Sequence, residues 1–211
     1  MNKTLRGGLL IVLGLILIAA ASLIWVLQDR QDQLAGQSAA ILLNELEQEL
    51  KHPVFVSPEP STIPQAPENS DPTPEQTLAP MPETTYSGYS MVGRLYIPVI
   101  GVQLPILSSW DYDLLKVAPC RYSGTAEGGN LILLGHNYKA HFKNLARLSP
   151  GDTVEFIAVD GSMYHYEVDA VDTIRGTDVD ALASDHELNI FTCTLDRVHR
   201  TVVRCRLIRD A

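Results

Sequence analysis

Cysteine and positive charge are both scarce in this 211-residue chain. The three cysteines, Cys120, Cys193 and Cys205, are odd in number and widely spaced, which excludes a fully paired disulfide framework and a zinc site with paired ligands. The formal net charge of −9 argues against a nucleic-acid partner, because binding phosphates requires a basic face. We expect no metal ion or other cofactor, and at least one free thiol.

Charge is absent from one long run near the N-terminus. Leu9 to Leu27 is an uncharged, mostly apolar stretch of about 19 residues, which as a helix spans about 28 Å, close to the hydrocarbon thickness of a bilayer. Lys3 and Arg6 precede it, so the positive-inside rule predicts that residues 1–8 are cytoplasmic. The sequence therefore predicts a single-pass cell-membrane protein whose folded domain is extracellular.

A cleaved signal peptide is the alternative for this run, because the small residues from Ala19 to Ser22 resemble a cleavage site. The apolar run continues for five residues beyond Ser22, however, and Trp25 falls where an aromatic side chain anchors a helix at the membrane interface. These two features favour an uncleaved anchor over residues 9–27.

Two segments separate the anchor from the folded domain. Residues 28–52 are expected to form a helical stalk, exposed or partly packed, because apolar side chains recur among Gln, Glu and Ala at Leu34, Ile41, Leu42, Leu46 and Leu50. Residues 53–88 hold nine of the 13 prolines, a composition typical of an extended linker that cannot bury a core.

Residues 89–211 are predicted to be mainly β, with short helical stretches only near residues 112–117 and 142–148. Asp160-Gly161 lies between two strand-like runs and is a strong hairpin signal. About seven or eight short strands at this spacing indicate a closed β-barrel or a sandwich. Cys205 lies among apolar neighbours in the last strand and is expected to be buried; a bridge to Cys120 is conceivable, but spacing does not establish it.

Three polar residues stand at strand ends in this region: His136 closes "LILLGH", Cys193 closes "LNIFTC" and Arg200 opens "RTVVRCRL". A cysteine beside a histidine can attack a peptide carbonyl, and an arginine can hold the developing oxyanion. The product would be a thioacyl enzyme that water or an amine resolves. Taken singly, each residue also has a structural explanation, as a core cysteine, a turn histidine and a solvated edge arginine.

Taken jointly, these segments resemble the sortase family, the membrane-anchored cysteine transpeptidases of Gram-positive bacteria. The resemblance is carried by "LLGHN" at Leu133–Asn137, "FTC" at Phe191–Cys193 and "HRTVVR" at His199–Arg204, which are similar to the family's catalytic-histidine, TLxTC and catalytic-arginine segments. It covers roughly residues 93–208. One departure is "NIFTC", in which Asn189 and Ile190 replace the Thr and Leu of the family motif.

The resemblance implies an eight-stranded sortase-type β-barrel with short helices. It also implies that His136, Cys193 and Arg200 are catalytic and that Thr192 is a substrate-binding position. Arg197 is the alternative arginine, but it lies only four residues after Cys193, whereas Arg200 opens the strand as the family pattern requires.

The implied reaction is cleavage of a C-terminal LPxTG-like sorting signal through a thioacyl enzyme, followed by transfer of the protein to an amine of a peptidoglycan precursor or a pilin lysine. Two alternatives stay open: a surface cysteine protease that uses water as the acceptor, and an inactive peptide-binding barrel. Some family members depend on calcium, but the acidic residues Asp169, Asp172, Asp178 and Asp180 match no EF-hand spacing, and we interpret them as solvated.

Overall fold

The computed structural model describes residues 3–51, 80–182, 184–194, 196 and 198–209. Their order begins with one long helix, followed by nine strands and a few short helices. The elements are α1 (Lys3–Lys51), β1 (Thr84–Tyr86), β2 (Tyr89–Ile97), η1 (Pro98–Ile100), β3 (Val102–Leu107), α2 (Leu114–Val117), β4 (Cys120–Ser123), β5 (Leu131–Gly135), η2 (Leu145–Arg147), β6 (Thr153–Ala158), β7 (Met163–Arg175), η3 (Asp180–Leu182), β8 (Leu188–Cys193) and β9 (His199–Leu207).

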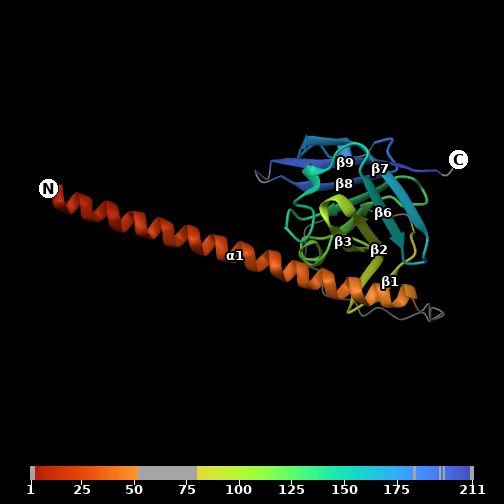
Figure 1. The fold of residues 1–211 in the computed structure, drawn as a ribbon, viewed down its shortest axis with the longest axis horizontal. Helices are drawn as coiled ribbons and strands as arrows, with labels where there is room; N and C mark the ends of the chain where they lie inside the picture. The colour runs from red at the N-terminus through yellow and green to blue at the C-terminus, as the bar shows by residue number, and fades with distance from the viewer. Residues whose placement is uncertain (1–2, 52–79, 183, 195, 197, 210–211) are drawn as a thin grey trace, which may run out of the picture.

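Eight strands close into a barrel, which confirms the predicted fold class (Figure 1). The strand order is β2-β3-β4-β5-β8-β9-β7-β6, and pairing of β2 with β6 completes the ring. The pairs β3–β4 and β5–β8 are parallel, whereas the other neighbours are antiparallel. Closure leaves few exposed backbone edges, and the parallel β5–β8 pair brings two strand ends to the same side of the barrel.

The hairpin predicted at Asp160-Gly161 joins β6 to β7. Gly161 has a φ of +87°, a left-handed conformation that glycine adopts without strain, and its amide donates to the carbonyl of Ala158 at 3.0 Å. The alternation of apolar and polar residues, with the Asp-Gly pair between the two runs, was therefore enough to locate the β6–β7 hairpin.

Alternation in β9 separates two apolar clusters. Val203 and Cys205 are fully buried in the cluster that fills the barrel, whereas Val202 belongs to a second cluster on the other face of the sheet. Cys120 is buried in this second cluster, and both Cys120 and Cys205 are free thiols, so the conceivable bridge between them is not formed. Burial raises the pKa of Cys205 to about 12 and raises that of Cys120 further, which keeps both thiols protonated.

Helix α1 has an exposed half and a docked half. From Leu13 to Leu27 its large apolar side chains are exposed, and its length and composition would allow it to cross a membrane. Further along, one face packs on the barrel through Ala35, Ala39, Leu42 and Leu46, each at most 2% exposed. Figure 1 shows the N-terminal half of α1 projecting away from the barrel, while its C-terminal half lies against the barrel, where it contacts β3, α2 and β1.

The barrel strands begin with β2 at Tyr89, and one short strand precedes them. Thr84–Tyr86 forms β1, which pairs with β2 across a two-residue turn at Ser87 and Gly88. Both turn residues have positive φ, +48° and +83°, as a tight type I′ hairpin requires. Residues 53–79 of the expected linker lie outside the described residues.

Candidate active site

The ends of β5 and β8 place His136 and Cys193 side by side. These two strands run parallel, with Gly135 opposite Thr192. His136 follows Gly135 directly after the end of β5, and Cys193 follows Thr192 as the last residue of β8. Both side chains line one cleft of about 560 Å³, together with Tyr138 and Thr194. The structure thus brings together two residues that lie 57 positions apart in the sequence.

Cys193 is the only exposed thiol among the three cysteines. Along β8, residues 188–192 are buried and Cys193 is exposed, so the strand ends where the thiol reaches solvent. Side chains alternate along a strand, and Cys193 therefore points to the face opposite that of Thr192. The thiol is therefore accessible from solvent in a cleft that also holds a histidine, and its structural explanation as a buried core residue does not hold.

Arg200 is the cross-strand partner of Cys193. The two residues are directly opposed in the antiparallel β8–β9 pair, so their side chains project from the same face of the sheet. The guanidinium lies over the ring of Phe191 at 5.5 Å from its centroid, a cation–π contact, and Arg200 is not among the described residues that line the cleft. Arg197, the alternative arginine, lies outside the described residues.

Asp196 stabilises the loop that joins Cys193 to Arg200. Its carboxylate accepts the amides of Val198 and His199 at 2.9 and 3.1 Å, the ring of His199 at 2.7 Å and the hydroxyl of Thr194. The hydrogen bonds from Thr194 and His199 are the main reasons that the pKa of Asp196 is well below its ordinary value. The Asp196 carboxylate is therefore ionised at neutral pH and keeps these hydrogen bonds, which hold the ends of β8 and β9 at a fixed spacing.

The segment after β5 is anchored beneath His136. A Cβ added to Gly135 would lie only 2.4 Å from the ring of Phe142, so only glycine lets this ring pack against the strand end. The amide of Phe142 donates to the carbonyl of His136 at 3.2 Å, and the Tyr138 ring lies 4.8 Å from the imidazole. Burial, and after it the positive charge of Lys116, lowers the pKa of His136, so the imidazole is neutral at neutral pH.

Thr192, predicted to bind substrate, is 3% exposed and does not line the cleft. Its hydroxyl oxygen is buried and has no hydrogen-bond partner among the described residues. The alternation that exposes Cys193 turns Thr192 toward the opposite face of the sheet.

Two cleft residues from α1 were missed by the sequence analysis. Gln31 and Asp32 line the cleft that contains Cys193, and Asp32 accepts the backbone amide of Lys139 at 3.3 Å. The only signal in the sequence was the spacing of small and apolar residues further along the helix, which indicates one packed face but not what it packs against.

Comparison with known proteins identifies the family. A family model described as the sortase domain matches residues 95–208, which include His136, Cys193 and Arg200. The chain belongs to the sortase family. This match confirms the resemblance noted from the three sequence segments. Sortases are cysteine transpeptidases.

Individual sortases are similar to this chain over its barrel. Sortase A of Bacillus anthracis is 29% identical over 124 residues, which cover 55% of this chain and 58% of the relative. The solved structure of sortase A from Corynebacterium diphtheriae is 25% identical, covers 58% of this chain and 63% of that one, and has a TM-score of 0.53. The fold is also that of a Clostridium perfringens sortase D5 transpeptidase, at 24% identity, a TM-score of 0.50 and coverage of 56% and 79%.

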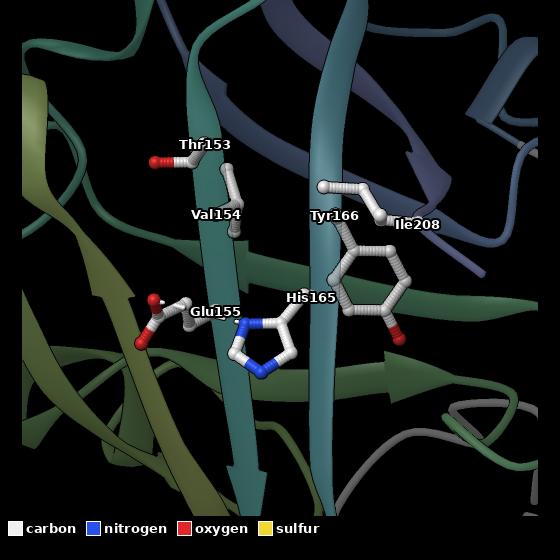
Figure 2. A pocket seen from close by; sticks show the side chains of 6 residues that line it. All are labelled: Thr153, Val154, Glu155, His165, Tyr166 and Ile208. Atoms are coloured by element: carbon white, nitrogen blue, oxygen red, sulfur yellow. Dashed lines mark ion pairs between the residues drawn. The ribbon is translucent and has the colours of Figure 1, made fainter. Parts of the chain in front are cut away.

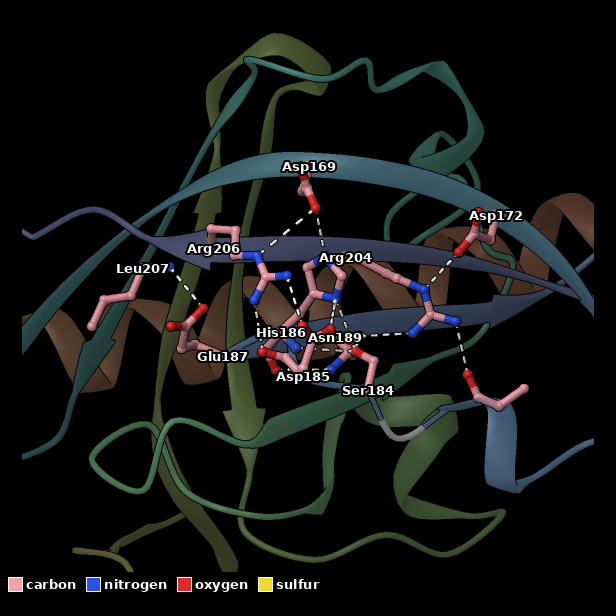
Figure 3. A network of polar contacts seen from close by, with 11 residues as sticks. Asp169, Asp172, Ser184, Asp185, His186, Glu187, Asn189, Arg204, Arg206 and Leu207 are labelled. Atoms are coloured by element: carbon pink, nitrogen blue, oxygen red, sulfur yellow. Dashed lines mark hydrogen bonds and ion pairs between the residues drawn. The ribbon is translucent and has the colours of Figure 1, made fainter.

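A polar network lies on the outer face of this sortase, around Asn189 and Arg204 (Figure 3). Asp169 pairs with His186 at 2.7 Å and with Arg206 at 3.8 Å, and Asp172 pairs with Arg204 at 2.6 Å. These two acidic residues are therefore ion-paired rather than simply solvated. Among the described residues, no group of three or more His, Cys, Asp or Glu side chains is placed to hold a metal ion.

A second, smaller pocket of about 250 Å³ lies over β6 and β7 (Figure 2). Glu155 and His165 face one another across the two strands at 3.7 Å, and Ile208 closes one side. His136, Cys193 and Arg200 do not line this pocket, whereas His136 and Cys193 both line the larger cleft.

Proposed function

We propose that this sortase is a transpeptidase in which Cys193 is the nucleophile, His136 the general acid and base, and Arg200 the group that holds the substrate carbonyl. The observation that carries the proposal is the register: β5 and β9 flank β8, so His136 and Arg200 both lie next to the exposed thiol. The Clostridium perfringens protein with the same fold is a transpeptidase, which supports the assignment.

The proposed first step transfers the acyl group to the enzyme. His136 is neutral because its pKa is lowered, so it can accept the thiol proton of Cys193 as the sulfur attacks the scissile carbonyl. A C–S bond forms, and the oxyanion is held by the donors of Arg200. The C–N bond then breaks, and the imidazolium returns its proton to the leaving amine.

The second step releases the product. An acceptor amine attacks the thioester, its proton passes to His136, the C–S bond breaks, and the thiolate of Cys193 regains a proton. Family membership favours a C-terminal LPxTG-like sorting signal as the donor and an amine of a peptidoglycan precursor or pilin as the acceptor. The apolar half of α1 would anchor the enzyme with residues 1–8 in the cytoplasm and the barrel outside.

The proposal is tested with the full chain in detergent micelles and a library of LPxTG-like peptides, with and without a primary amine. Intact-mass analysis should show one acyl adduct that Cys193→Ala abolishes, and the amine should convert the adduct to an amine-linked product. An adduct that is hydrolysed at the same rate with or without amine would indicate a protease, and no adduct with any peptide would indicate an inactive barrel.

The role of Arg200 has its own matched pair of variants. Arg200→Lys should impair acylation, because a single ammonium cannot reproduce the planar fork of guanidinium donors. Arg206→Lys, six residues further along the same strand and paired with Asp185, is the control and should retain activity. Full activity of Arg200→Lys would remove this residue from the mechanism.

A further inference from the structure

A buried histidine near the cleft takes no part in the steps proposed above. His141 is 0% exposed, and neither of its ring nitrogens has a hydrogen-bond partner among the described residues. Burial lowers its pKa to about 4, so the ring is neutral at neutral pH, and the nearby charges oppose one another, since Asp32 of α1 favours the imidazolium and His136 disfavours it. A buried polar ring without partners costs stability, so stability alone does not explain a histidine at this position.

Helices α1 and α2 enclose this ring. Backbone groups of Ala35 in α1 and of Val117 in α2 lie close enough to favour its charged form, although neither completes a hydrogen bond with it. The turn that carries the ring is pressed against α1, because a Cβ added to Gly36 would lie 3.1 Å from the Cβ of Ala140. The position of the ring is therefore set by the docked part of the stalk helix.

Three rings form a row from this buried position to the cleft. The ring of His141 lies 5.4 Å from that of Tyr138, and the ring of Tyr138 lies 4.8 Å from that of His136. Tyr138 and His136 line the cleft, whereas His141 does not. The backbone ties the same turn, because the amides of His141 and Lys143 donate to the carbonyl of Tyr138 at 3.0 and 3.2 Å. Ring packing and main-chain hydrogen bonds thus hold Tyr138 in place.

We propose that His141 is a positioning residue for the base of the reaction: packed between α1 and α2, its ring holds Tyr138 against His136 and so fixes the orientation of that imidazole. His141 acts only through Tyr138, because it does not itself reach the cleft. The role of His136 as the base rests on the proposed function, whereas the packing of the three rings does not.

The row of rings predicts how His136 responds when the ring of His141 is removed. Burial is the first cause that lowers the pKa of His136, with the charge of Lys116 in α2 the second, and Tyr138 packs against the imidazole. With a cavity behind it, Tyr138 can tilt away and admit water, so the pKa of His136 should rise toward its ordinary value. Acylation of Cys193 should slow by on the order of tenfold, because the base leaves its productive geometry.

The test compares His141→Ala, which removes the ring, with His141→Phe, which restores a planar ring that cannot be protonated. Both are made in the full chain in detergent micelles, and the pKa of His136 is read from an NMR titration whose resonance is assigned by its absence in His136→Gln. We expect a raised pKa and slow acylation in His141→Ala, and native values in His141→Phe. Equal shifts in both variants, or a shift in neither, would overturn the proposal. If His141→Ala does not fold, His141→Leu, which fills the site without a planar ring, takes its place.

Tyr138 provides the test of the route. Tyr138→Ala should raise the pKa of His136 as well, and adding His141→Ala to it should cause little further change, because the intermediate ring is already gone. Additive shifts would show that His141 acts on His136 by a different route, which would contradict the proposal.

His186 supplies the matched control for the loss of a buried histidine. It is 9% exposed in the outer polar network, where it pairs with Asp169 at 2.7 Å. His186→Ala should lower the Tm but leave the pKa of His136 unchanged, and a shift as large as that of His141→Ala would assign the effect to general loosening of the barrel. The titration needs no substrate, so a native chain that forms no acyl adduct would defeat the proposed function alone, while the pKa of His136 still decides the role of His141.

Discussion

Docking of α1 on the barrel makes a quantitative prediction, because the helix offers a buried leucine and an exposed isoleucine five residues apart. Leu46 is 1% exposed and packs in the apolar cluster around Met91 and Phe191, whereas Ile41 is 58% exposed. Leu46→Ala removes buried methyl and methylene groups and leaves a cavity, which typically costs about 3 kcal/mol. Ile41→Ala removes only exposed atoms and should change the free energy of unfolding by less than about 0.5 kcal/mol.

The difference is large enough to measure by thermal unfolding. For a barrel of this size, about 3 kcal/mol corresponds to a decrease in Tm of about 10 °C. The assay uses the full chain in detergent micelles and the fluorescence of Trp110, which stacks on Tyr122 at 5.5 Å within the same cluster. Replacing Trp25 by Phe in every variant leaves Trp110 as the only tryptophan.

Equal unfolding temperatures for the two alanine variants would refute the reasoning. In that case α1 would not contribute to the apolar cluster, and Gln31 and Asp32 could not be counted among the residues that line the cleft. A lower Tm for Leu46→Ala alone supports a fold in which the stalk helix is part of the catalytic domain, so a fragment that starts at Tyr86 would lack a piece of its core.

Three further predictions concern the site itself. Gly135→Ala should displace the Phe142 ring and slow acylation of the enzyme, measured by intact mass, whereas unchanged acylation would show that the ring does not position His136. Lys116→Met removes one of the two causes that disfavour the imidazolium, so the pKa of His136 should rise in an NMR titration, and an unchanged pKa would leave burial as the sole cause. Asp196→Asn should speed hydrogen exchange of the two loop amides that donate to this carboxylate, and normal protection would show that they are held by other contacts.

The strands and the neighbouring site residues were predicted because their signals are local, whereas the choice of a barrel over a sandwich came from the family resemblance. Alternating residues and turn pairs such as Asp160-Gly161 define strands and hairpins within a few positions. His136 and Cys193 each end an apolar run, and parallel pairing of those runs in equal register brings the two residues together. The orientation of Thr192 was not predicted, because the position where β8 ends decides which side chain reaches the cleft.

An exposed or partly packed stalk helix was predicted, but its docking on the barrel was not, and the reason lies in which side chains carry the packing. Leu34 and Ile41, two of the most apolar residues of the stalk, are 63% and 58% exposed. The buried face begins instead with Ala35 and Ala39, small residues that allow close approach to the barrel but make a weak apolar stripe.

Register explains why such a site tolerates little change in its framework. Because side chains alternate along β8, a slip of one residue against β5 and β9 would bury Cys193 and expose Thr192 in its place. Three features oppose this slip: the buried run before Cys193, the Phe142 ring over Gly135, and the Asp196 contacts across the loop. None of them contacts the thiol through a hydrogen bond or ion pair, yet together they determine that it emerges beside a neutral imidazole and opposite a guanidinium.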